Sequence, residues 1–342
     1  MPHGLGKLTA LRTLSIYTLG KKESSIPKRR GGLGDLDSLD ELRGDLRIVG
    51  LEHLRFSPLL EAKNAHLERK QYLRFLKLEW GSYVEAGDDR DKAIENDEKL
   101  LQSLRPQLNL KQLSISGYTG VRLSSWVSSL SNLVFIFILN CKWCQHIPPL
   151  NRFPSLKCLS LENLSALEYI GNDGSDVSSS SLESIFLQDL PKLRGWWRMR
   201  EAVTAEHDEH HHLPLFPSFP CLSELDIRLR VCPIMSLLPL IAPGSQTTHS
   251  SSSPFSDLSK LTRLTLWGLE EIESLPEEWL PNLTSLKWLH IVKCCKLRIS
   301  MSPLFQHLTA LEDLWIDDLM ELISNEDEEH NALDLQHFVI YL

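Results

Sequence analysis

Two pairs of cysteines are the residues in this sequence most suited to metal binding or redox chemistry. Cys141 and Cys144 form a C-x-x-C pair, a spacing typical of half a zinc site or of a redox pair. A structural zinc ion needs four ligands, and the adjacent Cys294 and Cys295 are poorly spaced to supply the other two. The chain also contains a repeated leucine pattern, described below. Cys141 and Cys294 occupy the same position in two copies of it, in the turn that follows the strand. We therefore interpret both as core residues.

Two further segments contain residue types that bind ions. Residues 201–212, EAVTAEHDEHHH, interleave four histidines with carboxylates, but this segment lies in the longest insertion, where nothing fixes ligand geometry. Residues 31–34, GGLG, are followed by Asp35 instead of the Lys and hydroxyl residue of a phosphate-binding loop. With no catalytic motif elsewhere, we predict no enzyme activity, no metal site and no cofactor.

The elements that organise the chain are copies of a leucine pattern. Leu156, Leu159, Leu161 and Leu164 follow L-x-x-L-x-L-x-x-L, in which the central pair alternates like a short strand with one buried face. One such strand cannot bury its face alone, so stacked copies are required. We take the central apolar residue of each copy as its anchor, and an aliphatic residue follows each anchor two positions later. The eleven anchors are Leu14, Leu46, Leu76, Leu113, Ile136, Leu159, Ile185, Leu225, Leu264, Leu289 and Leu314.

This pattern predicts an α/β leucine-rich-repeat solenoid, with a parallel sheet on a curved concave face and irregular loops and short helices on the convex face. We expect a single domain, 1–342, of about eleven repeats. The position five residues after each anchor holds Cys twice and Asn never, so we expect irregular turns packed by apolar side chains. Long intervals between anchors must contain insertions. These are expected near residues 20–35, 81–100, 171–181, 194–218 and 240–256.

Composition excludes several classes of function. The net charge of −9 argues against a nucleic-acid binder. The N-terminus lacks the apolar run of a secretory signal, and no apolar stretch is long enough to span a membrane. Seven cysteines without a paired framework indicate a reducing compartment, so we predict a cytoplasmic protein.

Side chains next to the anchors should point out of the concave sheet, and many of them are aromatic. Exposed aromatic rows are unusual on a solvated face and are enriched in interface cores. We therefore predict a partner-binding face; the alternative is that long loops or another domain cover it. Its residues are Phe75, Lys77, Phe135, Phe137, Phe186, Trp267, Trp288, His290 and Trp315, with Tyr17 and Leu139 in the same columns. Asp313 and Asp317 would add an acidic rim.

Several stretches together resemble the C-terminal leucine-rich-repeat domain of plant coiled-coil nucleotide-binding (NB-LRR) disease resistance proteins. The stretches are GKLTALRTL, ELRGDLRIVGLEHL, EAKNAHLERKQYLRFLKLEW, LRPQLNLKQLSISGYTGVRLSSW and LNCKWCQHIPPLNRFPSLKCLSL, and the resemblance is strongest over residues 4–170. It implies a repeat domain that restrains a nucleotide-binding switch domain and senses a pathogen effector, directly or through a guarded host protein.

In that family the N-terminal repeats tend to face the switch domain, which would be present in cis or in trans. The resemblance therefore implies a switch-domain contact for the basic loop, whose residues are Lys21, Lys22, Lys28, Arg29 and Arg30. The sequence contains no Walker motif, so we interpret it as a fragment, a truncated gene product or a partner-dependent module. The alternative is a stand-alone adaptor, such as the substrate-binding module of a ubiquitin ligase.

Overall fold

The computed structural model divides the chain into two compact units. It describes residues 4–20, 32–55, 65–81, 90–171, 179, 181–197, 219–229, 256–269, 275, 280–300, 306–323 and 337–341. The first unit comprises Met1–Pro148, Arg152–Leu156 and Ser160–Ser165, and the second comprises Pro149–Asn151, Lys157–Leu159 and Ala166–Leu342.

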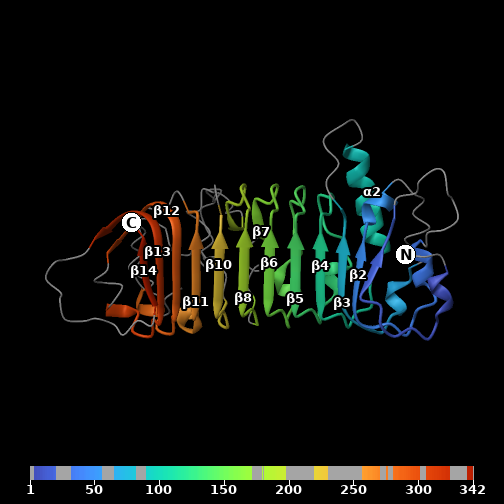
Figure 1. Cartoon of the computed structure of the whole chain (residues 1–342), viewed down its shortest axis with the longest axis horizontal. Coiled ribbons are helices and arrows are strands. Elements are labelled where there is room, and N and C mark those ends of the chain that lie inside the picture. Colours follow the sequence, from blue (N-terminus) through green and yellow to red (C-terminus); the bar gives the residue numbers. More distant parts are fainter. Residues whose placement is uncertain are drawn as a thin grey trace, which may run out of the picture. The chain divides into compact units, whose positions relative to one another are not determined.

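The first unit contains a parallel sheet whose strand order follows the sequence (Figure 1). Its strands are β1 (Ile16–Thr18), β2 (Arg43–Val49), β3 (Tyr72–Glu79), β4 (Gln112–Ser116), β5 (Phe135–Leu139) and β6 (Cys158–Glu162), of which β6 is shared with the second unit. The connections contain short 3₁₀ helices and one α-helix. These are η1 (Leu5–Lys7), η2 (Leu33–Leu36), η3 (Leu51–Leu54), η4 (Leu67–Arg69), α2 (Arg90–Ser103), η5 (Val127–Ser129) and η6 (Leu150–Arg152).

The second unit is built in the same way. Its parallel strands are β8 (Ser184–Gln188), β10 (Glu224–Arg228), β11 (Arg263–Trp267), β12 (Trp288–Ser300), β13 (Asp313–Ile323) and β14 (His337–Tyr341). A two-stranded parallel sheet, β7 (Tyr169–Gly171) and β9 (Gly195–Trp197), and the 3₁₀ helices η8 (Ser256–Lys260) and η9 (Leu280–Asn282) complete it. Strand β14 pairs with β13, from Asp313 opposite His337 to Asp317 opposite Tyr341.

The strand register stacks the anchor leucines, as the repeat pattern requires. In the first unit Leu46 lies opposite Leu76, which lies opposite Leu113, and Leu113 lies opposite Ile136. The same alignment runs through the second unit, where the anchors are at most 8% exposed: Ile185, Leu225, Leu264, Leu289 and Leu314. The anchor side chains thus form a buried column on one face of the sheet, which confirms the leucine-rich-repeat fold.

The register of the first repeat differs from the prediction by one residue. Ile16 pairs with Arg47 and Tyr17 pairs with Ile48, so Tyr17 enters the inward column. Tyr17 is fully buried, and its hydroxyl donates a hydrogen bond to the Gly32 carbonyl at 2.7 Å. Ile16 is 46% exposed instead. The prediction that Tyr17 lies on the partner-binding face is therefore wrong, because this short strand follows its pairing with β2 and not the L-x-I spacing.

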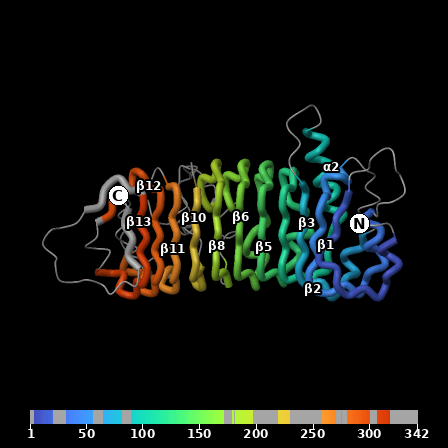
Figure 2. Tube along the Cα trace, viewed as in Figure 1, coloured from blue at the N-terminus to red at the C-terminus, as the bar shows by residue number. Residues whose placement is uncertain are grey.

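Backbone hydrogen bonds hold the turns that follow the strands. In each unit the Cα trace passes from one strand through a turn and a connection to the next parallel strand (Figure 2). The residue four positions after an anchor has a positive φ in several repeats, including Gly117, Asn140 and Asn163. Its N–H donates to the last carbonyl of the next strand, as Gly117 does to Leu139 and Asn140 does to Glu162. These hydrogen bonds pair the backbone groups of the turns. The turns therefore do not need the Asn that the consensus places five residues after the anchor.

Helix α2 occupies the insertion predicted at 81–100 (Figure 1). A buried ion pair holds it to the first unit. The Arg55 guanidinium donates two hydrogen bonds to the Asp97 carboxylate, at 2.9 and 2.7 Å, and their side chains are 2% and 0% exposed. Thr119 donates to the same carboxylate at 2.6 Å. The last turn of the helix accepts a hydrogen bond from the Trp126 indole at Leu101.

Leu159→Ala tests the anchor column. We expect a loss of about 2–5 kcal/mol in unfolding free energy, because a buried leucine leaves a cavity. Leu108→Ala is the control, since Leu108 is 50% exposed and should change stability by less than about 0.5 kcal/mol. Urea denaturation of the full chain measures both. Equal effects would contradict the assignment of Leu159 to the core.

Asp97→Ala tests the lock on α2. Removing one partner leaves the Arg55 charge buried and unpaired, which should cost about 3–5 kcal/mol in unfolding free energy. Replacing both residues with leucine should cost less than Asp97→Ala alone, because no unpaired charge remains. Asp91→Ala, at an exposed position of the same helix, serves as the control in the same denaturation experiment. A double variant no more stable than Asp97→Ala would refute this explanation.

Candidate protein-interaction faces

Three neighbouring strands of the second unit bring four predicted residues together. Trp267 ends β11, Trp288 and His290 lie on β12, and Trp315 lies on β13. Register places His290 directly opposite Trp315, with their rings 6.3 Å apart. Trp315 is 39% exposed and the other three residues are half-buried. These four residues form the tryptophan patch on the solvent side of the sheet.

Cations lie against the rings of the tryptophan patch. The Arg263 guanidinium is 4.9 Å and the Lys287 ammonium 5.8 Å from the centre of the Trp288 ring. Lys293 lies 5.3 Å from the Trp267 ring. Such contacts contribute about 0.5–1 kcal/mol each at exposed sites and restrict the motion of the indoles. Sequence reasoning missed these cations, although the position of Arg263, directly before the Leu264 anchor, could have indicated its place on the solvent side.

The acidic rim predicted beside Trp315 is present but partly engaged. The Asp313 carboxylate lies 2.9 Å from His290 Nε2, so one of its oxygens faces the tryptophan patch and not the solvent. Asp317 is half-buried and lies opposite Val292 in the register. The acidic rim therefore consists of Asp313, which pairs with His290, and Asp317.

Phe186 does not belong to this cluster. It lies on β8, opposite Asp226 of β10, and β10 separates it from β11. On the same side β10 also carries Arg228, whose guanidinium donates two hydrogen bonds to Asp226, both at 2.8 Å. A charged strand thus separates Phe186 from Trp267, and the two do not form one aromatic surface.

The first unit has a smaller aromatic surface on β5. The Phe135 and Phe137 rings are parallel within 3°, with centres 6.5 Å apart, and Phe135 is 37% exposed. We call this pair the phenylalanine patch. Phe75 on β3 is half-buried and lies opposite Gln112, so the polar residues of β4 separate it from Phe135.

Lys77, predicted as part of the binding face, belongs to an ion-pair network. Its ammonium lies 2.5 Å from the Glu79 carboxylate, which also accepts a hydrogen bond from Arg47 at 2.8 Å. Partial burial by itself would raise the pKa of Glu79, but the hydrogen bonds from Lys77 and Arg47 together lower this pKa below its ordinary value of 4.5. The network fixes Lys77 at the edge of the phenylalanine patch, since Lys77 and Phe137 both lie opposite Ser114.

The remaining chemical candidates do not form a reactive site among the described residues. Cys141 and Cys144 are buried, and burial raises the pKa of the Cys144 thiol to about 12. The Cys141 sulfur lies 3.3 Å from the Leu139 carbonyl, in agreement with its predicted core role. No group of three potential metal ligands occurs within the described part of the chain. The histidine tract at 201–212 and the basic loop residues Lys21, Lys22, Lys28, Arg29 and Arg30 lie outside it.

The helices that the structure describes include none with the length and apolar character of a membrane span. Stacked parallel strands, buried anchor columns and partly exposed aromatic patches define a leucine-rich-repeat protein-binding region. Residues 33–164 match the family of R13L1/DRL21 LRRs. The chain is a leucine-rich-repeat region homologous to plant NB-LRR disease resistance proteins, and this kind of region is non-catalytic, as predicted.

The similarity to relatives extends over most of the chain. Disease resistance protein RGA2 of Solanum bulbocastanum is 31% identical over 299 residues, which cover 86% of this chain and 26% of the relative. RGA4 of the same species is 32% identical over 293 residues, 84% of this chain and 27% of the relative. RPP13-like protein 1 of Arabidopsis thaliana is 28% identical over 313 residues. The chain spans about a quarter of the length of these relatives.

Solved structures with similar folds are more distant. The TLR13 chain of a TLR13–ssRNA13 complex gives a TM-score of 0.49 at 17% identity and covers 89% of this chain and 36% of that chain. The plant peptide hormone receptor RGFR1, in complex with RGF2, gives a TM-score of 0.46 at 16% identity and covers 94% of this chain and 46% of the receptor.

The Glu79 network predicts a pH dependence. Because the pKa of Glu79 is lowered in the folded protein, its stabilisation is complete above about pH 4.5 and is lost as the pH falls through the lowered pKa. For a partly exposed network the expected size is about 1 kcal/mol. Denaturation measured from pH 7 to pH 3 should show a smaller acid dependence in Glu79→Gln than in the wild type. Glu168→Gln, at an exposed position, is the control, and an unchanged acid slope in Glu79→Gln would refute the assignment.

Proposed function

We propose that the chain is the recognition and restraint region of a plant intracellular immune receptor. In this role it binds a pathogen effector or a guarded host protein and holds a nucleotide-binding switch domain inactive. A cytoplasmic location belongs to the same proposal. The observation that carries it is the tryptophan patch, because it lies on the solvent side of a sheet homologous to the repeat region of disease resistance proteins.

The tryptophan patch supports recognition through its chemistry. Partly exposed indoles held by cations present a large apolar area at a small entropic cost, since their rotamers are already restricted. Aromatic residues of this kind dominate binding energy at protein interfaces. The His290–Asp313 pair and Arg263 surround the indoles with polar groups, which resembles the polar rim of such interfaces.

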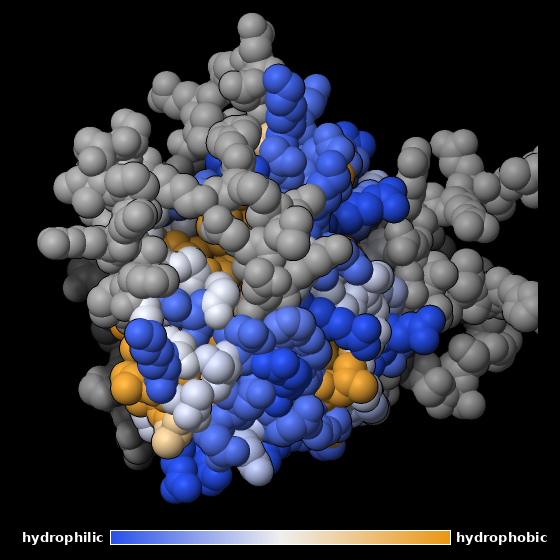
Figure 3. All heavy atoms as spheres, turned by 90° about the vertical axis from the view of Figure 1, so that its right-hand side faces the viewer, coloured by the Kyte–Doolittle hydropathy of each residue, from blue (hydrophilic) through white to orange (hydrophobic). Residues whose placement is uncertain are grey.

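The N-terminal end of the first unit supports restraint of a switch domain. Its surface is largely hydrophilic with small hydrophobic areas (Figure 3). Two large apolar residues before β2 are solvent-exposed, Leu8 at 55% and Ile16 at 46%. Strand β1 is the first strand in the order of the described sheet and pairs with β2. A contact of a few kcal/mol here, made only in the inactive state, is sufficient to bias a two-state switch.

Sequencing the intact transcript tests the receptor assignment. We expect an in-frame Walker motif, G-x-x-x-x-G-K-[ST], upstream of Met1, because the proposal requires a nucleotide-binding switch domain. An intact transcript without this motif would argue against restraint in cis. The probe for restraint in trans is the separately expressed switch domain of RGA2. If this chain did not bind the probe either, restraint in trans would be contradicted as well.

Trp288→Ala tests the recognition face. We expect the melting temperature to stay close to that of the wild type, whereas binding of a partner selected with the wild-type chain in a two-hybrid screen should weaken about tenfold or more. Thr265→Ala, opposite His290 on the same side of the sheet, is the control and should leave binding nearly unchanged. If Trp288→Ala destabilised the chain as much as Leu159→Ala, Trp288 would be a core residue and the patch would not be a binding surface.

A further inference from the structure

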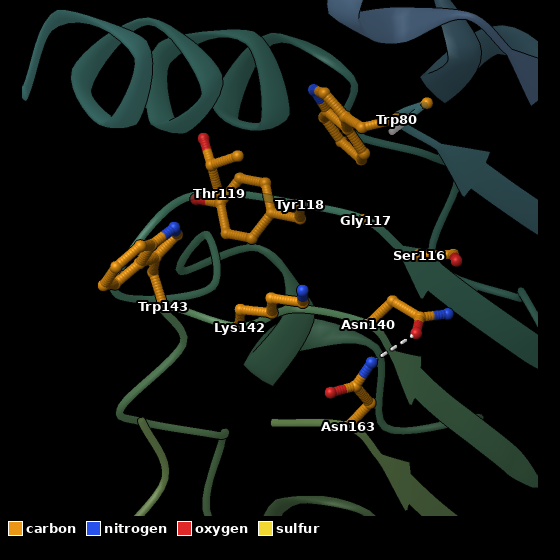
Figure 4. Close-up of a pocket in the computed structure, with 10 residues that line it drawn as sticks. Trp80, Ser116, Gly117, Tyr118, Thr119, Asn140, Lys142, Trp143 and Asn163 are labelled. Atoms are coloured by element: carbon orange, nitrogen blue, oxygen red, sulfur yellow. Dashed lines mark hydrogen bonds between the residues drawn. The ribbon is translucent and has the colours of Figure 1, made fainter. Parts of the chain in front are cut away.

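The two edges of the sheet in the first unit use their polar side chains differently. Where the strands end, turn side chains pair with one another: Asn163 Nδ2 donates to Asn140 Oδ1 at 2.8 Å (Figure 4). Where the strands begin, basic side chains lie side by side from β1 to β4. We call these four residues the basic row; they are Arg12, Arg43, Arg74 and Lys111.

Backbone hydrogen bonds hold the members of the basic row next to one another. The Arg43 N–H donates to the Arg12 carbonyl at 2.8 Å, and the Lys111 N–H donates to the Arg74 carbonyl at 2.9 Å. Between β2 and β3 the register shifts after Gly44, where Arg74 is the extra residue of β3. A bulge of this kind redirects the side chain of its extra residue. Neighbouring strands are about 4.8 Å apart, so the row spans about 14 Å.

Most of the positive charge of the basic row is not neutralised by the residues that the structure describes. All members except Arg43 form no ion pair with any of these residues, and none of the four is buried. The Arg43 guanidinium lies 3.3 Å from the Glu41 carboxylate, and both side chains are half exposed. Asp45 is exposed on β2. The row therefore has four cations beside two carboxylates, in a chain whose net charge is −9.

Other carboxylates of the same repeats are paired with other cations. Asp37 and Asp40 lie 2.6 and 3.5 Å from the Arg69 guanidinium. Glu79 belongs to the ion-pair network described above. These groups therefore do not cancel the charge of the basic row.

Two exposed apolar side chains lie beside the basic row. Tyr72 is 48% exposed and Leu108 is 50% exposed. The Arg43 guanidinium lies 4.5 Å from the centre of the Tyr72 ring. Gln107 Nε2 donates to the Leu73 carbonyl at 2.7 Å, which holds the neighbouring Leu108 close to the start of β3. The surface thus combines unneutralised cations with apolar area, a combination that suits an anionic partner with apolar side chains.

We propose that the basic row binds an acidic segment of a partner protein in an extended conformation. Carboxylates of the segment meet the cations of the row, and an aliphatic side chain between them packs on Tyr72 and Leu108. Glu41 and Asp45 would repel an unbroken line of phosphates, whereas a peptide can place polar residues opposite them. A protein is therefore favoured over a nucleic acid. This inference goes beyond the function proposed above, because it uses neither aromatic patch and requires no switch domain.

The test is a titration of the full chain with the fluorescein-labelled peptide DELDELDE, followed by fluorescence anisotropy at about 50 mM salt. We expect saturable binding. The peptide NQLNQLNQ has the same length and leucines but no carboxylate, so it should bind about tenfold more weakly or worse. Equal binding of the two peptides, or no saturable change in anisotropy, would overturn the proposal.

Two double variants separate the basic row from a general charge effect. Arg74→Gln with Lys111→Gln should weaken binding of DELDELDE about tenfold. Arg194→Gln with Lys192→Gln removes the same two residue types at exposed positions of the second unit and should leave binding unchanged. Equal losses in the two double variants would contradict the proposal. The melting temperature of each variant is measured alongside, and both should stay close to that of the wild type.

Leu108→Ala tests the apolar part of the surface without a change of charge. It should weaken binding of DELDELDE about threefold, while stability stays close to that of the wild type because Leu108 is exposed. Unchanged binding in both Leu108→Ala and the double variant of the row would overturn the proposal.

A nucleic acid is the remaining alternative for a basic surface. The probe is a fluorescein-labelled oligothymidylate of about twelve nucleotides, titrated under the same conditions. We expect it to bind more weakly than DELDELDE. Tighter binding of the oligonucleotide that is lost in the double variant Arg74→Gln with Lys111→Gln would identify a nucleic-acid site and overturn the proposal.

Discussion

The structure depends on the in-register burial of one aliphatic column per strand. Each anchor is covered by the anchors of the strands before and after it, as Leu76 is by Leu46 and Leu113. Burial of apolar surface between adjacent repeats therefore stabilises the fold, and no single core is shared by all repeats. For this reason further repeats can be added along one direction. The other side of each strand is released from packing. Its residues can vary, and this freedom allows both the tryptophan and the phenylalanine patches.

The same register has a second effect at the strand ends. Because the strands are parallel and aligned, equivalent turn residues follow one another at the same edge, and their backbone groups bond from repeat to repeat. Asn140 and Asn163 have the same positive φ, and their side chains meet for this reason. Helix α2 packs beside these turns, where the Arg55–Asp97 ion pair holds it. The sheet thus positions two different kinds of surface, the outward side of its strands and the turns at one edge.

Much of the fold could be predicted from the sequence because the repeat spacing records the register directly. Anchors such as Leu113 and Leu264 were identifiable from Leu and Ile spacing alone. Tyr17 was assigned to the wrong side, since in a three-residue strand pairing with β2 decides and local spacing does not. The fully buried Lys70, whose ammonium donates to the Leu36 carbonyl at 2.6 Å, gave no signal, because lysine is normally a surface residue.

For the candidate site, sequence pattern predicted which aromatics share a face but not which of them meet. Trp288 and His290 were placed correctly, whereas the cations on the indoles depend on side-chain geometry that spacing does not specify. The packing of α2 on the first unit could not be predicted at all, because it joins Asp97 of an insertion to Arg55 and Thr119 of other repeats. The equal spacing of Gly117, Asn140 and Asn163, 23 residues apart, has a genetic consequence. Recombination that removes or duplicates one such interval joins a strand end to an equivalent turn, so a gene of this kind can change its repeat number while every remaining strand keeps its frame.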